Sequence, residues 1–324
     1  MHTSDELLNI INEALEKENF NREPLELYEP ITYILSLGGK RIRPVMLLMA
    51  AEMYGGDINK AIPAALGIEI FHNFSLVHDD IMDRAPLRRG KQTVHEKWNA
   101  NTAILSGDTM LVKAYEQFLR LDDPLVKPSL EVFSLIATGV CEGQQLDMNF
   151  EERNDVTIDE YLGMIRLKTA VLIGAALKLG GIMAGAGAED LERLFEFGIH
   201  TGILFQLRDD LLDTYGDSAV FGKKQYGDIL NCKKTYLYLK ALEYASGKDK
   251  LKFAELYANT SIEPEMKIKK VMKYFDAADV KKHTEARINE HFMIAERAFE
   301  SIRAEQEKKY LLKDYTDKMV GRKF

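Results

Sequence analysis

Residues 74–83 read FSLVHDDIMD and residues 203–213 read ILFQLRDDLLD, so the pattern Asp-Asp-x-x-Asp occurs twice in apolar surroundings. With 3.6 residues per helical turn, the first and last aspartates of each copy lie one turn apart on the same side of a helix. A carboxylate in an apolar helix is costly to bury unless a cation or hydrogen bonds compensate it. Both stretches are therefore predicted to be helices whose carboxylates bind a cation.

The carboxylate pattern favours magnesium. Mg2+ takes one or two carboxylates per ion and completes its shell with water and substrate phosphate oxygens. A single Asp-Asp-x-x-Asp pattern is more often a solvated helix face, but the duplication and the apolar flanks favour a metal site. The predicted ligands are Asp79, Asp80, Asp83, Asp209, Asp210 and Asp213. Basic clusters that suit a metal-bridged diphosphate follow both copies: Arg84, Arg88, Arg89 and Lys91, then Lys223, Lys224, Lys233 and Lys234.

Helical periodicity runs through all 324 residues, and no segment alternates with period two, so an all-α fold is expected. Capping boxes at Thr3 and Thr157 mark two helix starts. No Pro, Ser or Gly tract separates domains, which favours one large helical domain over residues 1–324. Breaks between helices are expected near residues 38–39, 55–56, 84–92, 122–128, 151–156, 180–181, 214–234 and 246–250.

Composition limits the functions that the chain can have. The formal net charge of −8 argues against nucleic-acid binding. The two cysteines, Cys141 and Cys232, cannot form a disulfide framework, and the charged amphipathic N-terminus is not a signal peptide, so a cytoplasmic protein is expected. Residues 170–188 are apolar apart from Lys178. Their Gly and Ala content predicts a tightly packed buried helix and no integral membrane span.

Further polar residues stand beside the two motifs along the chain. GGKRIRP, residues 38–44, places three cations beside glycines and just before a helix, an arrangement that suits an anion. Taken alone, such a segment is at least as often a solvated basic turn. GQQLD, residues 143–147, places an amide and a carboxylate on an apolar helix, and Lys168-Thr169 follows a run of apolar residues. These buried polar groups require partners. His72, taken alone, is more often a hydrogen-bonded core residue than a ligand.

The motifs together, in this order, resemble the trans-isoprenyl diphosphate synthases. The resemblance spans residues 38–235 and includes GGKRIRP, HDDIMD with RRG downstream, GQQLD, the Lys-Thr pair, and GILFQLRDDLLD with its Lys-rich loop. It implies an all-α bundle around a central cavity, usually a homodimer, whose two aspartate motifs bind three Mg2+ ions. The substrates would be isopentenyl diphosphate and an allylic diphosphate (dimethylallyl, geranyl or farnesyl).

The resemblance also implies roles for single residues. Isopentenyl diphosphate would be bound by Lys40, Arg43, His72 and Arg89. The allylic diphosphate would be bound by Arg88, Lys168, Lys223 and Lys233, with Gln144, Asp147, Phe205 and Gln206 completing the substrate site. Mg2+ and these cations would ionise the allylic C–O bond, the double bond of isopentenyl diphosphate would attack, and the departed diphosphate near Lys168 and Thr169 would take the proton.

Several positions bear on the conformation of the site and the length of the product. Tyr226 and the pair Asn231-Cys232 depart from the family pattern in the loop after the second motif, and the basic tail Arg322-Lys323 could close over the substrate. The growing chain would extend along Ser75, Phe74 and Phe71, one and two turns before Asp79. An aromatic residue there would act as a floor, which favours geranylgeranyl or farnesyl diphosphate as the product.

Three other classes of protein share parts of this pattern. A class I terpene cyclase usually replaces the second aspartate motif with an Asn-Ser-Glu type of site. A non-catalytic subunit of a heteromeric prenyl synthase typically loses one or both motifs. A di-iron carboxylate bundle requires paired Glu-x-x-His motifs, and Glu69 to His72 stands unpaired in the sequence. Both aspartate motifs are intact here, which favours the synthase.

Overall fold

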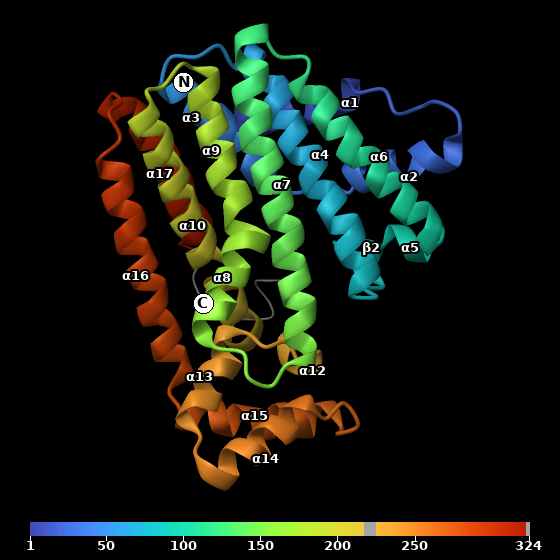
Figure 1. Ribbon diagram of the computed structural model, residues 1–324, viewed down its shortest axis with the longest axis vertical. Helices are drawn as coiled ribbons and strands as arrows, with labels where there is room; N and C mark the ends of the chain where they lie inside the picture. Colours follow the sequence, from blue (N-terminus) through green and yellow to red (C-terminus); the bar gives the residue numbers. More distant parts are fainter. Residues whose placement is uncertain (217–224, 322–324) are drawn as a thin grey trace. The chain divides into compact units, whose positions relative to one another are not determined.

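The protein is almost entirely helical, as its sequence predicts. The computed structural model describes residues 1–216 and 225–321 (Figure 1). Its helices are α1 (Ser4–Lys17), α2 (Leu25–Ser36), α3 (Ile42–Met53), α4 (Ile58–Met82), α5 (Val94–Lys97), α6 (Ala100–Phe118), α7 (Asp123–Glu152), α8 (Ile158–Ile165), the π-helix η1 (Arg166–Ala170), α9 (Val171–Met183), α10 (Ala188–Tyr215), α12 (Gly227–Leu230), α13 (Tyr236–Tyr244), α14 (Gly247–Ala258), α15 (Pro264–Ala277), α16 (Val280–Glu300) and α17 (Gln306–Val320). In the described residues the strands form one short antiparallel hairpin, in which β1 (Leu87–Arg88) pairs with β2 (Lys91–Gln92).

The chain packs into two compact units, each assembled from separate segments. The first unit comprises Met1–Val140, Leu172–Phe195 and Ser301–Tyr315, and the second comprises Cys141–Val171, Glu196–Glu300 and the residues from Thr316 onward. Each aspartate motif therefore belongs to a different unit. The expected single domain over residues 1–324 stays a prediction, as does the central cavity.

Helix α4 is the core helix of the first unit and carries the first aspartate motif at its C-terminal end. It begins after Asp57, whose side chain accepts a hydrogen bond from the Asn59 N–H, and it packs against α3 and α6 (Figure 1). Most of its residues between Ala64 and Val77 are buried, because the helix is apolar on nearly every side. The position and burial of this helix bring carboxylates to the end of a core element.

The break expected at Gly180-Gly181 is wrong, because α9 continues through both glycines to Met183. These glycines permit close packing. A Cβ atom on Gly180 would lie 2.2 Å from the carbonyl oxygen of Leu47, and one on Gly181 would lie 2.7 Å from the Leu191 side chain. Helix α9 is buried as predicted up to Ile182, but the helix expected over residues 170–188 ends at Met183, and Gly185, Gly187 and Ala188 are exposed.

Other helix boundaries differ from expectation by a few residues. Helix α7 begins at Asp123 and includes Pro128, and α14 begins at Gly247, so the breaks expected at 122–128 and 246–250 are much shorter. A proline near the N-terminus of a helix interrupts few hydrogen bonds, which explains the early start of α7. Both capping boxes are confirmed, with Thr3 and Thr157 each accepting from the N–H of the glutamate three residues later.

Within the described ranges, one helix is long and apolar enough to cross a membrane by length and composition alone. This helix is α7, of which 33% is buried in the most apolar window. A core helix can pass the same test, so the absence of an integral membrane span stays a prediction.

The packing of α9 predicts the effect of adding one methyl group. Gly180→Ala should destabilise the protein by about 1–3 kcal/mol, because the Cβ atom meets a backbone oxygen that cannot move aside. Gly163→Ala is the matched control, since nothing lies within 4 Å of its Cβ position in helix α8, and it should stabilise by about 0.5–1 kcal/mol. Urea unfolding measures both, and equal effects of the two substitutions would contradict this account of the packing.

Candidate active site

The first aspartate motif is held by an arginine from the hairpin that follows it. Asp80 is 1% exposed, and Arg88 binds it with two hydrogen bonds, Nε to Oδ2 and Nη2 to Oδ1, both 2.8 Å. The same Nη2 lies 3.6 Å from Oδ2 of Asp79. Asp83 ends the helix, and its N–H donates to the Asp79 carbonyl at 2.8 Å. The structure thus places Arg88 against Asp79 and Asp80, while Asp83 is exposed at the end of the same helix, and joint metal binding by the three carboxylates stays a prediction.

Burial dominates the electrostatics of this motif. It raises the pKa of Asp80, and the bidentate bond from Arg88 opposes that shift only partly. The neighbouring Asp79 raises the pKa of Asp80 further, because two carboxylates repel each other. A divalent cation would relieve this repulsion.

Arg43 and His72 form a second polar cluster of the first unit. Nη1 of Arg43 donates to Nε2 of His72 at 3.1 Å, and burial followed by four nearby arginines holds the pKa of His72 well below its usual value. The imidazole is therefore neutral and accepts. Burial lowers the pKa of Arg43 to about 10, which leaves it a cation at neutral pH. Its Nε is buried and has no hydrogen-bond partner, which marks a place where an acceptor is missing.

Of the remaining cations near GGKRIRP, Arg41 has a structural role, whereas Lys40 is exposed and Arg89 links this segment to the hairpin. Arg41 is 5% exposed, donates to Glu69 at 2.6 Å and to the Leu35 carbonyl, and so holds the core together. Arg41, to which the sequence assigned no substrate role, is bound instead by a buried glutamate. Lys40 is exposed. Arg89, at φ 52°, donates to the carbonyl of Gly38, which joins the glycine segment to the hairpin.

The expected chain-length residues lie in an aromatic cluster. Phe71 is fully buried and packs on Phe74 and Phe133, with ring centroids 5.4 and 5.2 Å apart. Phe74 is 7% exposed and also contacts His78. Ser75 is partly buried and donates to the His72 carbonyl at 2.8 Å. Both phenylalanines are thus core residues, and their role as a floor stays a prediction.

The second aspartate motif is linked to a chain of hydrogen bonds in the second unit. Asp210 is 5% exposed and accepts from the Tyr161 hydroxyl and from Nε2 of Gln206 at 3.0 Å. Thr169 donates to the other side of the Gln206 amide at 3.2 Å. Burial raises the pKa of Asp210 to about 7, against the hydrogen bonds that lower it. Gln206 and Thr169, predicted as site residues, are therefore tied to the motif.

Asp213 and Asp228 lie where the chain returns to the second motif. The carboxylate of Asp213 accepts from the N–H groups of Gly227 and Asp228, both at 3.1 Å. Burial, followed by Asp210, Asp213 and Asp209, raises the pKa of Asp228 well above its usual value. Sequence reasoning missed Asp228 as a fourth carboxylate of this site. An acidic residue within a run of lysines was the available signal.

A π-helix positions Lys168 and Thr169. Lys168 lies in η1, and its Nζ donates to Asp147 at 2.7 Å. Gly143 makes this possible, since a Cβ atom there would lie 2.3 Å from the backbone nitrogen of Lys168. Lys233 donates to Glu151 at 2.7 Å and lies 3.9 Å from Asp147. The predicted residues Lys168, Lys233 and Asp147 therefore form one cluster, to which Glu151 is an unpredicted addition.

Five predicted positions either fall outside the described residues or show less detail. Lys223 and the tail Arg322-Lys323 lie outside them. Gln144 and Phe205 lie on α7 and α10 of the second unit, half-buried.

The residues present fit magnesium by their chemistry. Carboxylate oxygens are the donors that Mg2+ prefers, and each motif supplies one buried aspartate, Asp80 or Asp210, whose pKa is raised by burial and by the neighbouring carboxylates of the same motif. Among the described residues, no three acidic, histidine or cysteine side chains form a ready ligand set. Arg88, Tyr161 and the start of α12 bind the carboxylates instead.

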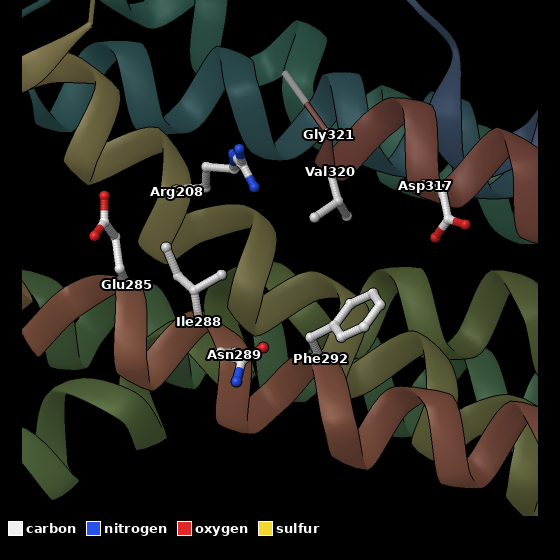
Figure 2. A pocket seen from close by; sticks show the side chains of 8 residues that line it. All are labelled: Arg208, Glu285, Ile288, Asn289, Phe292, Asp317, Val320 and Gly321. Carbon is white, nitrogen blue, oxygen red and sulfur yellow. The ribbon is translucent and has the colours of Figure 1, made fainter. Parts of the chain in front are cut away.

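A cavity of about 420 Å3 lies in the second unit between α10, α16 and the end of α17 (Figure 2). Arg208, which precedes the second motif, lines it with Glu285, and Ile288, Phe292 and Val320 supply apolar walls. None of the predicted site residues lines this cavity.

Known proteins resemble this chain in both sequence and structure. The family model described as polyprenyl synthetase matches residues 24–275. The chain belongs to this family. A geranylgeranyl pyrophosphate synthase of Geoglobus acetivorans is 40% identical over 310 residues, 94% of this chain and 95% of that protein. A geranylfarnesyl diphosphate synthase of Natronomonas pharaonis is 40% identical over 250 residues, 72% and 73% of the two chains.

Solved structures give the same result for the fold. A crystal structure of a geranylgeranyl pyrophosphate synthase has a TM-score of 0.93 and 43% sequence identity, and the match covers 100% of both chains. One from Pyrococcus horikoshii has a TM-score of 0.90 and 33% identity, and the match covers 98% of this chain and 99% of that one. The all-α isoprenoid synthase fold and the assignment as a prenyltransferase that elongates prenyl diphosphates are confirmed. Polyprenyl synthetases use Mg2+ and join isopentenyl diphosphate to allylic diphosphates.

The raised pKa of Asp210 predicts how the metal-free enzyme responds to pH. With a pKa of about 7 in the folded protein and about 3.9 in the unfolded chain, folding takes up a proton between these values. Stability therefore falls as pH rises through that window. Asp210→Asn should raise the Tm of metal-free protein at pH 8 by about 2–4 °C or more and change it little at pH 5. Differential scanning calorimetry with Asp159→Asn, an exposed carboxylate, as the control checks this, and an effect independent of pH would refute it.

Proposed function

We propose that this polyprenyl synthetase makes a short-chain trans-prenyl diphosphate, geranylgeranyl or farnesyl diphosphate. It would do so by head-to-tail condensation of isopentenyl diphosphate with dimethylallyl, geranyl or farnesyl diphosphate. The observation that carries the proposal is the burial of Asp80 and Asp210, the middle aspartates of the two Asp-Asp-x-x-Asp motifs, each bound by cationic or hydrogen-bonding side chains that an incoming metal diphosphate can replace.

We assign metal binding to Asp79, Asp80, Asp83, Asp209, Asp210 and Asp213, for three Mg2+ ions. When bound, Mg2+ supplies the positive charge that stabilises the leaving diphosphate. Arg88, Lys168, Lys223 and Lys233 would bind the same diphosphate. To do so, Arg88 must exchange Asp80 for phosphate oxygens, Lys168 must exchange Asp147, and Lys233 must exchange Glu151.

Isopentenyl diphosphate is assigned to Lys40, Arg43, His72 and Arg89. The buried Nε of Arg43 supports this assignment, because a phosphate oxygen would satisfy it. Because the His72 imidazole is neutral, it accepts a hydrogen bond from Arg43 and does not repel the guanidinium. After the double bond attacks, the released diphosphate, held by Lys168 and Thr169, takes the proton that leaves.

We propose that the enzyme is a cytoplasmic homodimer without a membrane span and without nucleic-acid partners. Large apolar side chains of the first unit support the dimer: Leu105, Val112 and Leu119 are 60%, 57% and 63% exposed, and Leu135 on α7 is 73% exposed. The first three are spaced seven residues apart, so they lie along one side of α6 and its end. Burial against a second copy would remove them from water.

Removal of one carboxylate from either motif should stop catalysis. We expect Asp79→Ala and Asp209→Ala each to lower turnover of labelled isopentenyl diphosphate by about 10²-fold or more, because each leaves the diphosphate with less metal charge. Asp159→Ala, at an exposed site on α8, is the control and should keep wild-type turnover. Circular dichroism verifies that the helices remain.

The same assay separates the alternatives. A terpene cyclase would release cyclic hydrocarbons, and a non-catalytic subunit would turn over only with a partner chain. Near-normal activity in either alanine variant would rule out the joint use of both motifs.

The aromatic cluster leads to a prediction about product length. If Phe74 is the floor, Phe74→Ala should lengthen the product by one isoprene unit or more, and adding Phe71→Ala should extend it further. Tyr115→Ala is the control, since its ring contacts Phe133 at 4.8 Å and neither of these phenylalanines. Mass spectrometry of the dephosphorylated alcohols measures chain length. An unchanged product from the double variant would assign the floor to other residues.

A further inference from the structure

Cys232 occupies a special position in the second unit. It lies in the turn between α12 and α13, directly before Lys233, and is partly exposed. Its φ of 58° is left-handed, a conformation that favours glycine and costs a side-chain-bearing residue about 1 kcal/mol or more. A cysteine at such a position has to be supported by its surroundings.

The support is a buried lysine from α15. Lys267 is 2% exposed, and its Nζ donates to Sγ of Cys232 at 3.1 Å. The ring of Tyr257 lies 5.7 Å from Nζ. Among the described residues, no oxygen atom accepts from the other two N–H groups of this ammonium. A buried ammonium without a carboxylate partner is costly, so its remaining N–H groups favour a further acceptor beside the sulfur.

The same surroundings hold the backbone of Lys233. The hydroxyl of Tyr257 donates to the Lys233 carbonyl at 2.7 Å, and the Lys233 N–H donates to the Asp228 carbonyl at 2.9 Å. Cys232 and Lys233 are therefore fixed by adjacent groups of one layer, α14 and α15. A group added to the sulfur would have to displace either the Lys267 ammonium or this turn.

We propose that Cys232 is a redox modification site, activated by Lys267, whose oxidation displaces Lys233. A peroxide is the oxidant. The thiolate sulfur attacks one peroxide oxygen, an S–O bond forms and the O–O bond breaks. The sulfur loses two electrons, and the second oxygen leaves as hydroxide and takes a proton from solvent. The new oxygen on sulfur accepts from the N–H groups of Lys267 to which the described residues offer no oxygen acceptor.

Only the effect on turnover rests on the proposed function, through the assignment of Lys233 to diphosphate binding. The reactivity of the thiol does not. The two parts can therefore fail separately.

Thiol reactivity is measured on the intact protein with iodoacetamide and, separately, with hydrogen peroxide followed by a cyclic 1,3-diketone that traps sulfenic acid. Cys141 on α7 is the internal control. The residue as a whole is exposed, but partial burial of its sulfur, together with Glu142, raises the pKa of its thiol. We expect Cys232 to react about tenfold faster than Cys141 at pH 7, quantified by mass spectrometry of the two peptides. Equal or slower reaction of Cys232 in the wild-type protein would overturn the proposal.

Substitutions of α15 test the part played by the ammonium. Lys267→Met should lower the rate of thiol modification at Cys232 about tenfold and leave the rate at Cys141 unchanged. Lys267→Arg should keep most of the wild-type rate at Cys232. Lys270→Met, an exposed lysine of the same helix, is the matched control and should have no effect. An unchanged rate in a folded Lys267→Met protein would overturn the proposal, and if that variant does not fold, the Lys267→Arg protein and the wild-type ratio decide.

Turnover then tests the consequence. Stoichiometric oxidation should lower the prenyl transfer rate at least fivefold in wild-type protein, with recovery on addition of a thiol reductant. Cys232→Ser should be active and insensitive to peroxide. Loss of activity in both proteins would assign the damage elsewhere, whereas full activity of the oxidised wild type would refute the link to Lys233 and leave the proposed function untouched.

Discussion

Burial of carboxylates at the ends of apolar helices is the constraint on which the rest of this structure depends. Asp80 and Asp210 are each no more than 5% exposed, and burial raises the pKa of both. Such groups are tolerated only when donors or cations surround them. Arg88 on the hairpin and Tyr161 with Gln206 on α8 and α10 supply those donors. The hairpin that carries Arg88 and the hydrogen bonds from Tyr161 and Gln206 thus supply the donors that the two buried aspartates need.

The cations around the motifs differ from Arg41 in their own exposure. Lys168 and Lys233 bind Asp147 and Glu151, which are partly exposed, so an incoming phosphate can compete for them. Arg88 binds the buried Asp80, but its own side chain is partly exposed. Arg41 and Glu69 are both buried almost completely and form a structural pair. Exposure of the cation itself therefore distinguishes those that can serve a substrate from the one that holds the core.

Much of the site could be predicted from the sequence because spacing and polarity encode it locally. The duplicated aspartates, the Lys-Thr pair and the GQQLD segment need only helical periodicity and the cost of burying polar groups. Tertiary context decides the rest. Nothing in the local pattern says that Glu69 claims Arg41, that Asp228 returns to the second motif, or that Gly180 permits contact with Leu47 and does not end a helix. These depend on which segments meet, and that information is not local.

The π-helix at Arg166–Ala170 has a consequence for how helix α8 joins α9. A π-turn accommodates one more residue than an α-turn, and each residue of an α-helix advances the face by about 100°. Deletion of Thr169 would therefore remove the bulge and keep a continuous helix, because an α-turn needs one residue fewer. The length of the segment, and not only the identity of Lys168, thus decides the direction in which the lysine points and whether it reaches Asp147.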